Sequence, residues 1–131
     1  MTVELSMLVY ATALLLALVL VQSAAGIRAQ GAVALAGPRD DLPPPKLFQA
    51  RALRVVDNHR EGLTIFAPLV LAAALAHVSN HWTVLGAELF FYSRVVHAAL
   101  YLLGVPMVRP LAWGVGLVGT MMLLAALLGL T

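Results

Sequence analysis

Three polar side chains stand close together in an otherwise apolar stretch of the chain. Arg94, His97 and Tyr101 fall at positions i, i+3 and i+7, and in a helix this spacing places them on one face. An arginine near the middle of a membrane span costs about 2.5–3.5 kcal/mol on insertion scales, so such residues normally face a bundle interior or a water-filled pocket. The pattern predicts a buried functional site. The alternative is a structural ion pair between Arg94 and Glu61, or another carboxylate, that holds two helices together.

A second polar ridge occurs earlier in the chain. It consists of Arg51, Arg54, Asn58 and Glu61, at i, i+3, i+7 and i+10. This spacing again predicts one helical face. Taken alone, the ridge also fits a solvated helix surface, where each charge pair contributes only about 0.2–0.5 kcal/mol.

We expect the two ridges to lie at a similar depth in the membrane. If the earlier helix enters the membrane from the cytoplasm at about Gly62, Glu61 lies at the interface. The later helix runs the opposite way and leaves at about Gly104, so Arg94 lies roughly 15 Å from that exit. Arg109 opens the next helix at the same end. We therefore expect one pocket with an excess of arginine. It suits a zwitterionic ligand with extra carboxylates, since arginine binds carboxylates bidentately and Glu61 can accept an ammonium.

The elements that position these residues are predicted to be transmembrane helices. Of the 131 residues, 62% are hydrophobic and 11% are charged, whereas soluble domains carry about 25% charged residues. We predict an all-α integral membrane four-helix bundle, a single domain over residues 1–131, with spans at about 4–27, 47–78, 82–104 and 108–130. The first span has a secretory signal as its alternative. Its start lacks Lys and Arg, however, and its apolar stretch is longer than that of a signal.

Positive charge sets the predicted orientation. Six of the eight Lys and Arg residues, from Arg28 to Arg60, lie between the apolar part of the first span and that of the second, which begins at about Gly62. Arg109 lies between the third span and the apolar part of the fourth. The connection around His77 to His81 has neither Lys nor Arg. The positive-inside rule then places the two charged loops in the cytoplasm and both termini outside it. We predict a multi-pass protein of a bacterial inner membrane.

Residue types exclude several classes of function. The chain has no cysteine, which excludes disulfides and a cysteine nucleophile. No metal site is expected, because His77 and His81 have no further ligand at suitable spacing. No basic run is interleaved with aromatics, so no nucleic-acid partner is expected. Glu88 lies about 240° around its helix from Arg94, off the predicted site. Three glycines of the last span are expected to allow close helix packing: Gly114, Gly116 and Gly119.

Two runs of residues resemble the signatures of a known family. The run Arg51–Glu61, RALRVVDNHRE, is similar to the second-helix signature of the MAPEG family, the membrane-associated proteins in eicosanoid and glutathione metabolism. The run from Arg94 through His97 and Tyr101 to Arg109 is similar to helix three and the start of helix four in microsomal prostaglandin E synthases. The number of spans, the length and the charged first loop also match. The resemblance covers essentially the whole chain and indicates a short, bacterial-type member.

The resemblance implies a homotrimer that binds glutathione as a co-substrate between neighbouring subunits, near the cytoplasmic side. It implies that Arg109 is catalytic and stabilises the glutathione thiolate, since a cation beside a thiol lowers the pKa of that thiol. It also implies that glutathione is held by Arg51, Arg54, Asn58, Glu61, Arg94, His97 and Tyr101. The implied function is a glutathione-dependent membrane transferase or peroxidase. Its second substrate would be a hydrophobic electrophile, a lipophilic small molecule that enters from the membrane lipids.

Three residues depart from the pattern of these relatives. Pro110 stands where a serine hydroxyl is expected, Asp57 where a basic residue is expected, and Gly62 where an aromatic often follows the glutamate. Two alternative functions therefore stay open. One is a non-catalytic family member that binds lipid or a partner protein through the same cleft. The other is a small transporter or an accessory subunit of a larger membrane complex, although a transporter needs a broken helix or a continuous polar path, and the outer half of the sequence indicates neither.

Overall fold

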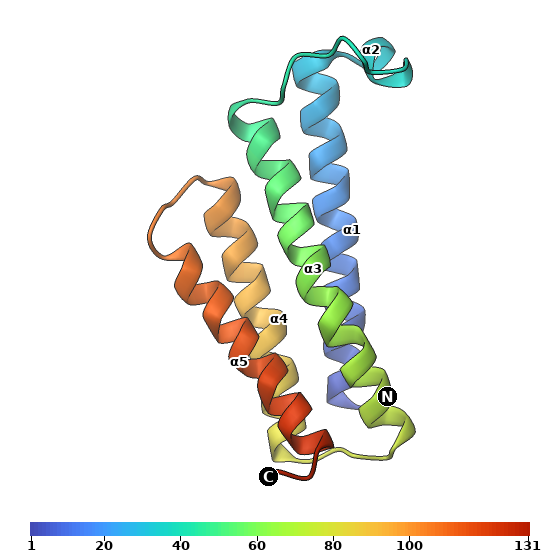
Figure 1. Cartoon of the computed structure of the whole chain (residues 1–131), viewed down its shortest axis with the longest axis vertical. Helices are drawn as coiled ribbons and strands as arrows, with labels where there is room; N and C mark the ends of the chain where they lie inside the picture. Colours follow the sequence, from blue (N-terminus) through green and yellow to red (C-terminus); the bar gives the residue numbers. More distant parts are fainter.

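In a computed structural model that describes all residues from 1 to 131, the chain forms four long helices and one short one. The long helices are α1 (Val3–Gln30), α3 (Leu47–Leu75), α4 (His81–Leu102) and α5 (Arg109–Leu127), and the short helix α2 (Ala32–Ala36) lies in the first loop. The all-α class and the four main helices agree with the sequence prediction. Both termini lie at one end of the elongated bundle, and α1 and α3 extend beyond the α4–α5 turn at the other end (Figure 1).

Local sequence signals explain where the helices begin and end. The Oγ1 atom of Thr2 accepts a hydrogen bond from the third residue of α1, and α1 ends at Gly31, whose positive φ of 89° favours glycine. The N-terminus of α4 is a capping box formed by Asn80 and Thr83. In α5, Pro110 occupies the first turn, where its missing N–H leaves no hydrogen bond unmade.

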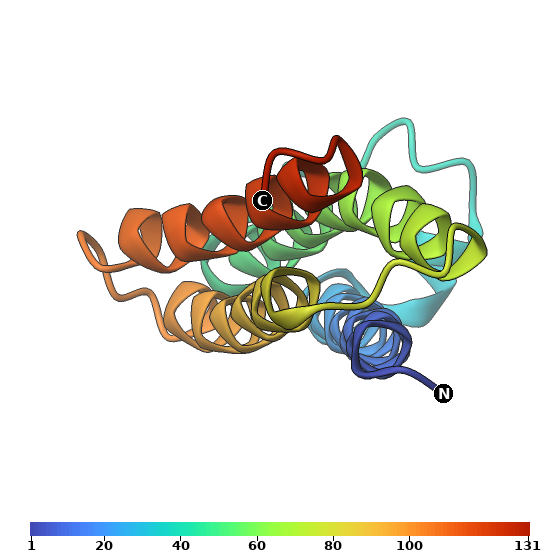
Figure 2. The ribbon, with the colours of Figure 1, turned by 90° about the horizontal axis from the view of Figure 1, so that it is seen from below.

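The four long helices occupy the corners of a quadrilateral when the bundle is seen end-on (Figure 2). Helix α1 packs against α3 and α4, and α5 packs against α4 and α3. The core of this bundle is apolar. Phe66 of α3 and Phe90 of α4 are fully buried and stack with their ring centroids 3.9 Å apart. Met7, Ala11 and Leu123 from α1 and α5 complete the same cluster.

Glycines set the close approach of α4 and α5. A Cβ atom on Gly86 would lie 2.6 Å from the carbonyl oxygen of Gly119, and one on Gly116 would lie 2.6 Å from Oγ of Ser93. The prediction that Gly116 and Gly119 allow close packing is confirmed. It is wrong for Gly114, where a Cβ atom would meet nothing within 4 Å, because that residue does not lie on the face of α5 that contacts its neighbours.

A buried carboxylate ties α1 to the opposite loop. Glu4 is 2% exposed, and its Oε1 accepts hydrogen bonds from Oγ of Ser79 at 2.9 Å and from Oγ1 of Thr83 at 2.5 Å. Thr83 also belongs to the capping box of α4. Helix α1 is therefore an integral part of the bundle.

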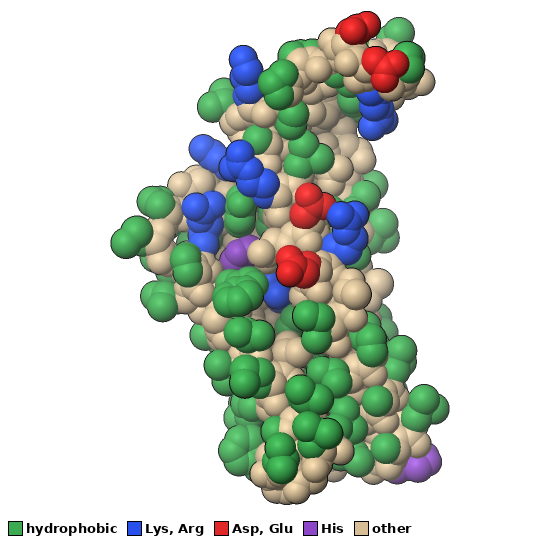
Figure 3. Space-filling view, in the orientation of Figure 1, with side chains coloured by type: hydrophobic (Ala, Val, Ile, Leu, Met, Phe, Trp, Pro, Cys, Tyr) green, Lys and Arg blue, Asp and Glu red, His purple; other side chains and the backbone are tan.

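The surface of the bundle divides into a charged half and an apolar half. Lys and Arg side chains gather toward the end opposite the termini, and the other half of the visible face is largely hydrophobic (Figure 3). Only 28 of the 131 residues are buried, so most apolar side chains remain on the outside. Helices α1 and α5 are long and apolar enough to cross a membrane, by length and composition. An exterior of this kind requires lipid or another protein surface around it.

Candidate functional site

Arg94 is the buried centre of the predicted site. Its side chain is 4% exposed, and its Nη1 donates a 2.7 Å hydrogen bond to Oδ1 of Asn58, which joins α4 to α3. The guanidinium lies directly against Gly62, where a Cβ atom would overlap Nη2 and lie 2.8 Å from Cζ. The Nε atom of Arg94 is buried and has no partner within the protein. An acceptor in the space beside it would remove the free-energy penalty of that unpaired donor.

Glu61 lies beside Arg94 but does not pair with it. The two side chains line one small cavity of about 70 Å³, here called the Arg94 cavity, together with Asn58 and Trp113. The carboxylate of Glu61 is exposed, and the single ion pair of the chain instead joins exposed Arg60 to Asp57 at 2.6 Å. The alternative in which Arg94 and Glu61 form a structural ion pair is therefore not what the structure shows. The main partner of Arg94 is an amide.

A second cavity gathers the remaining polar residues predicted on α4 and α5. It has a volume of about 290 Å³, is here called the Arg109 cavity, and is lined by Asn58, His97, Tyr101, Arg109, Pro110 and Trp113. The Cζ atom of Arg109 lies 4.5 Å from the ring centroid of Tyr101, within range for a cation–π interaction. His97 is 4% exposed and meets the same ring edge-on, with centroids 5.5 Å apart.

The two cavities adjoin at shared walls. Asn58 and Trp113 line both of them, so a ligand that fills one approaches the other. Together they present the guanidinium groups of Arg94 and Arg109 and the carboxylate of Glu61. Such a set of charges can hold a ligand with at least one carboxylate or other anionic group and an ammonium.

Two residues of the predicted ridge lie outside these cavities. Arg51 packs against the α4–α5 turn, where a Cβ atom on Gly104 would lie 2.7 Å from Cζ of its guanidinium. Arg54 is exposed and lines neither cavity. Within one chain, these two residues therefore lie at the margin of the site. The two cavities bring together the other six expected residues: Asn58, Glu61, Arg94, His97, Tyr101 and Arg109.

Sequence reasoning did not single out two residues, one that lines the site and one next to it in the chain. Trp113 stands four residues after Arg109, and this i, i+4 relation on one face of α5 was the available signal. His59 is 2% exposed, and its Nε2 lies 2.8 Å from the carbonyl oxygen of Ala11 in α1. Its position next to Asn58 gave no periodic signal, because it faces α1 rather than the ridge.

The three departures from the family pattern have different consequences. Asp57 is exposed and paired with Arg60, and it lines neither cavity. Gly62 is what allows the guanidinium of Arg94 to reach the backbone of α3. Only Pro110 lines the Arg109 cavity, and it brings no hydroxyl to the side of Arg109.

Comparison with known proteins identifies the family. The family model described as MAPEG matches residues 7–129, and the chain belongs to the MAPEG family. Members of this family are integral membrane proteins, typically glutathione-dependent membrane transferases or peroxidases, and they are associated with lipophilic substrates. Searches of curated proteins and of solved structures gave no match.

Proposed function

We propose that this MAPEG protein is a glutathione-dependent membrane transferase or peroxidase that acts on hydrophobic electrophiles. The observation that carries the proposal is the convergence of His97, Tyr101 and Arg109 on one cavity of about 290 Å³. This cavity adjoins a second one that holds Arg94 and Glu61. Membership of a family in which glutathione is the common co-substrate supports it.

The charges of the site complement those of glutathione, which carries two carboxylates, one ammonium and a thiol. In the proposed complex, Arg94 binds one carboxylate through the donors that face its cavity. Glu61 makes no ion pair within the chain, so its carboxylate is free to bind the ammonium. Arg54 and Arg51 lie further along the same helix and would bind the second carboxylate, with Asn58, His97 and Tyr101 completing the pocket.

Arg109 would carry the chemistry. A guanidinium beside the glutathione thiol favours the charged form and so lowers the pKa of that thiol. The thiolate sulfur then attacks an electrophilic carbon, a C–S bond forms, and the leaving group departs with its bonding electron pair. With a lipid hydroperoxide, the thiolate attacks the terminal oxygen and the O–O bond breaks. The alkoxide takes a proton, and a second glutathione converts the sulfenic product to disulfide and water. Pro110 supplies no hydroxyl, so Arg109 is the cationic group of this cavity that would stabilise the thiolate.

The proposal includes a homotrimer in which neighbouring subunits complete each site. Arg54 and Glu61 are both exposed on α3, where a second copy can cover them. Large apolar side chains such as Leu16 and Val118 are exposed as well, at 62% and 52%. We further propose that the end of the bundle that holds both termini (Figure 1) lies outside the cytoplasm, since the positive charge lies at the opposite end.

The test is stopped-flow absorbance at the thiolate band when detergent-purified protein is mixed with glutathione. We expect proton release and a new thiolate signal, and the loss of both in Arg109→Ala. The matched control is Arg60→Ala, which removes an exposed arginine that lines neither cavity and should leave the signal unchanged. If the wild-type protein gives no signal at millimolar glutathione, the enzyme proposal fails.

The same experiment tests a second function, which the proline at position 110 favours. A non-catalytic family member that binds lipid or a partner protein would keep the cleft and lose the chemistry. The missing hydroxyl beside Arg109 is the observation that favours it. Glutathione binding by calorimetry, without thiolate formation in the stopped-flow trace, would support this function over the enzyme.

A further inference from the structure

A separate groove lies on the α4–α5 pair, and the polar site does not use it. Its volume is about 440 Å³, larger than either cavity of the polar site. Apolar side chains make up most of its lining, and Glu88 is the only charged residue in it. It shares no lining residue with the Arg94 cavity or the Arg109 cavity. The groove is therefore a distinct feature of the bundle.

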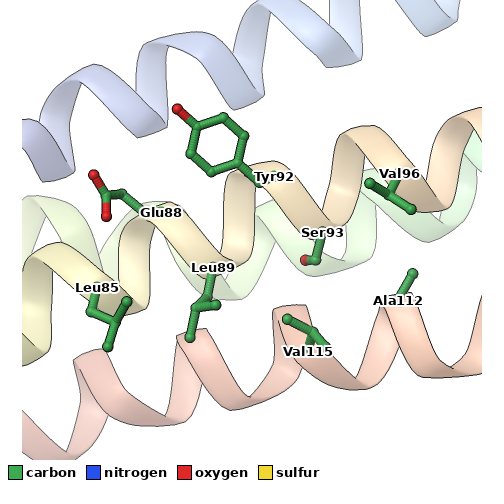
Figure 4. A pocket seen from close by; sticks show the side chains of 8 residues that line it. All are labelled: Leu85, Glu88, Leu89, Tyr92, Ser93, Val96, Ala112 and Val115. Atoms are coloured by element: carbon green, nitrogen blue, oxygen red, sulfur yellow. The ribbon is translucent and has the colours of Figure 1, made fainter.

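The residues of the groove divide into two sides (Figure 4). Glu88 and Tyr92 stand one turn apart on α4 and point to the same side of that helix. Leu85 and Leu89 point to the other side, toward α5, where Ala112 and Val115 face them. The groove therefore has a side with a carboxylate and an aromatic ring, and an aliphatic side that faces α5. Ser93 adds no free hydroxyl proton, since its Oγ donates to the carbonyl oxygen of Phe90 at 2.8 Å.

Glu88 has no partner in the chain. It is half-buried and makes no hydrogen bond, and the single ion pair of the chain lies elsewhere. It stands seven residues into α4, about 10 Å along the helix axis, in a chain whose family consists of integral membrane proteins. An ionisable side chain at such a depth is costly unless it is paired, and it marks a candidate binding site.

A second copy of the chain would bring no Lys or Arg to Glu88 in a parallel assembly, where side chains at the same depth meet. The Lys and Arg residues gather in the other half of the bundle (Figure 3). The arginine nearest in depth on α4 is Arg94, which is buried against Asn58. A cationic molecule that enters the groove from the bilayer would supply the positive partner that Glu88 lacks within the chain.

We propose that this groove binds a lipophilic amine, a molecule with one ammonium head and a hydrocarbon tail that is dissolved in the bilayer. The ammonium pairs with the carboxylate of Glu88, and the adjacent face of Tyr92 adds a cation–π contact. The tail lies along Leu85, Leu89 and Val115. An aminophospholipid fits less well, because the groove offers no cation to its phosphate. This site is independent of glutathione.

The experiment measures equilibrium binding of radiolabelled dodecyltrimethylammonium to the full-length protein in phosphatidylcholine nanodiscs. We expect saturable binding that dodecylamine displaces and that dodecanol and dodecanoate do not. Glu88→Gln should weaken binding by about tenfold or more, as expected when an ionic contact is lost in a partly desolvated site. Because Glu88 makes no hydrogen bond or ion pair, this variant should unfold at the wild-type temperature.

Two further variants complete the experiment, one as a control and one that blocks the groove. Asp57→Asn removes an exposed carboxylate far from the groove and should bind the cation as the wild type does. Val115→Trp fills the groove and should abolish saturable binding. Equal binding by Glu88→Gln, or equal displacement by dodecanol, would show simple partitioning and overturn the proposal. Displacement by phosphatidylethanolamine at the same concentration as dodecylamine would assign the groove to a lipid head group instead.

Discussion

The absence of one Cβ atom decides how closely Arg94 approaches α3. The guanidinium occupies the space that a side chain at position 62 would need, and it donates there to Asn58. An aromatic at this position would displace Arg94 from the amide. The buried position of Arg94 therefore requires glycine at position 62. The glycine that departs from the family pattern is what lets Arg94 reach Asn58.

Gly62→Ala should damage ligand binding more than folding. The new Cβ atom overlaps the guanidinium, so Arg94 must move away from Asn58. Hydrogen bonds to charged groups contribute about 1.5–3 kcal/mol, so glutathione affinity should fall by about tenfold or more. Isothermal calorimetry in detergent measures the effect. The control is Gly114→Ala, where nothing lies within 4 Å of the new Cβ. Equal affinities in the two variants would contradict the role given to Gly62.

Glu61→Gln separates a ligand-binding carboxylate from a structural one. Glu61 is exposed and unpaired, so the free energy of unfolding should change by no more than about 0.5 kcal/mol. Glutathione affinity should nevertheless fall about tenfold, because the ammonium loses a charged partner. Thermal unfolding and calorimetry on the same preparation measure both quantities. A collapse in the unfolding temperature would restore the structural ion-pair account.

At the scale of the helix, periodicity predicted which residues share a face but not where a facing helix ends. Asn58 and Glu61 line the cavities as the i, i+3 spacing indicates. Arg51 and Arg54 continue the same ridge, yet Arg51 lies against Gly104 in the α4–α5 turn, and Arg54 is exposed and lines neither cavity. Where α4 ends relative to α3 is a tertiary property, and the local pattern does not contain it.

Two residues whose surroundings depend on how the helices are rotated and packed were not predicted from the sequence. Trp113 reaches both cavities because of how α5 is turned about its axis. His59 faces the carbonyl oxygen of Ala11 because α1 packs behind α3. By contrast, the stripe of Arg94, His97 and Tyr101 was predictable, since an arginine in an apolar helix has few orientations that avoid lipid.

Gly86→Ala should destabilise the whole bundle rather than the site alone. The new Cβ atom would lie 2.6 Å from the carbonyl oxygen of Gly119, and backbone has no rotamer that relieves the contact. Helices α4 and α5 must separate, and overpacking of this kind costs about 1–3 kcal/mol. The unfolding temperature in detergent should fall clearly, whereas Gly114→Ala in the neighbouring helix should leave it unchanged. Similar unfolding temperatures for both variants would show that the α4–α5 contact does not limit the stability of the bundle.

At the scale of the whole molecule, charge and apolar surface divide along the long axis. Cations gather in the half toward α2 and the first loop, and the visible face of the other half is largely hydrophobic (Figure 3). The polar site lies within the half that holds the arginines. A hydrophilic co-substrate would therefore reach it from the charged side, and a lipophilic one from the bilayer. This arrangement is consistent with a membrane enzyme whose two substrates come from different phases.

We expect the charged end of the long axis to face the cytoplasm. The positive-inside rule places the first loop in the cytoplasm and the α3–α4 loop outside. The chain has no cysteine, so the single variants Asp41→Cys and His81→Cys, both at exposed positions, each carry one reporter thiol. In intact spheroplasts, a membrane-impermeant maleimide should label His81→Cys and spare Asp41→Cys, which should react only after lysis. The wild-type chain controls for background labelling. The opposite pattern would reverse the topology and place the Arg109 cavity on the outer side, away from cytoplasmic glutathione.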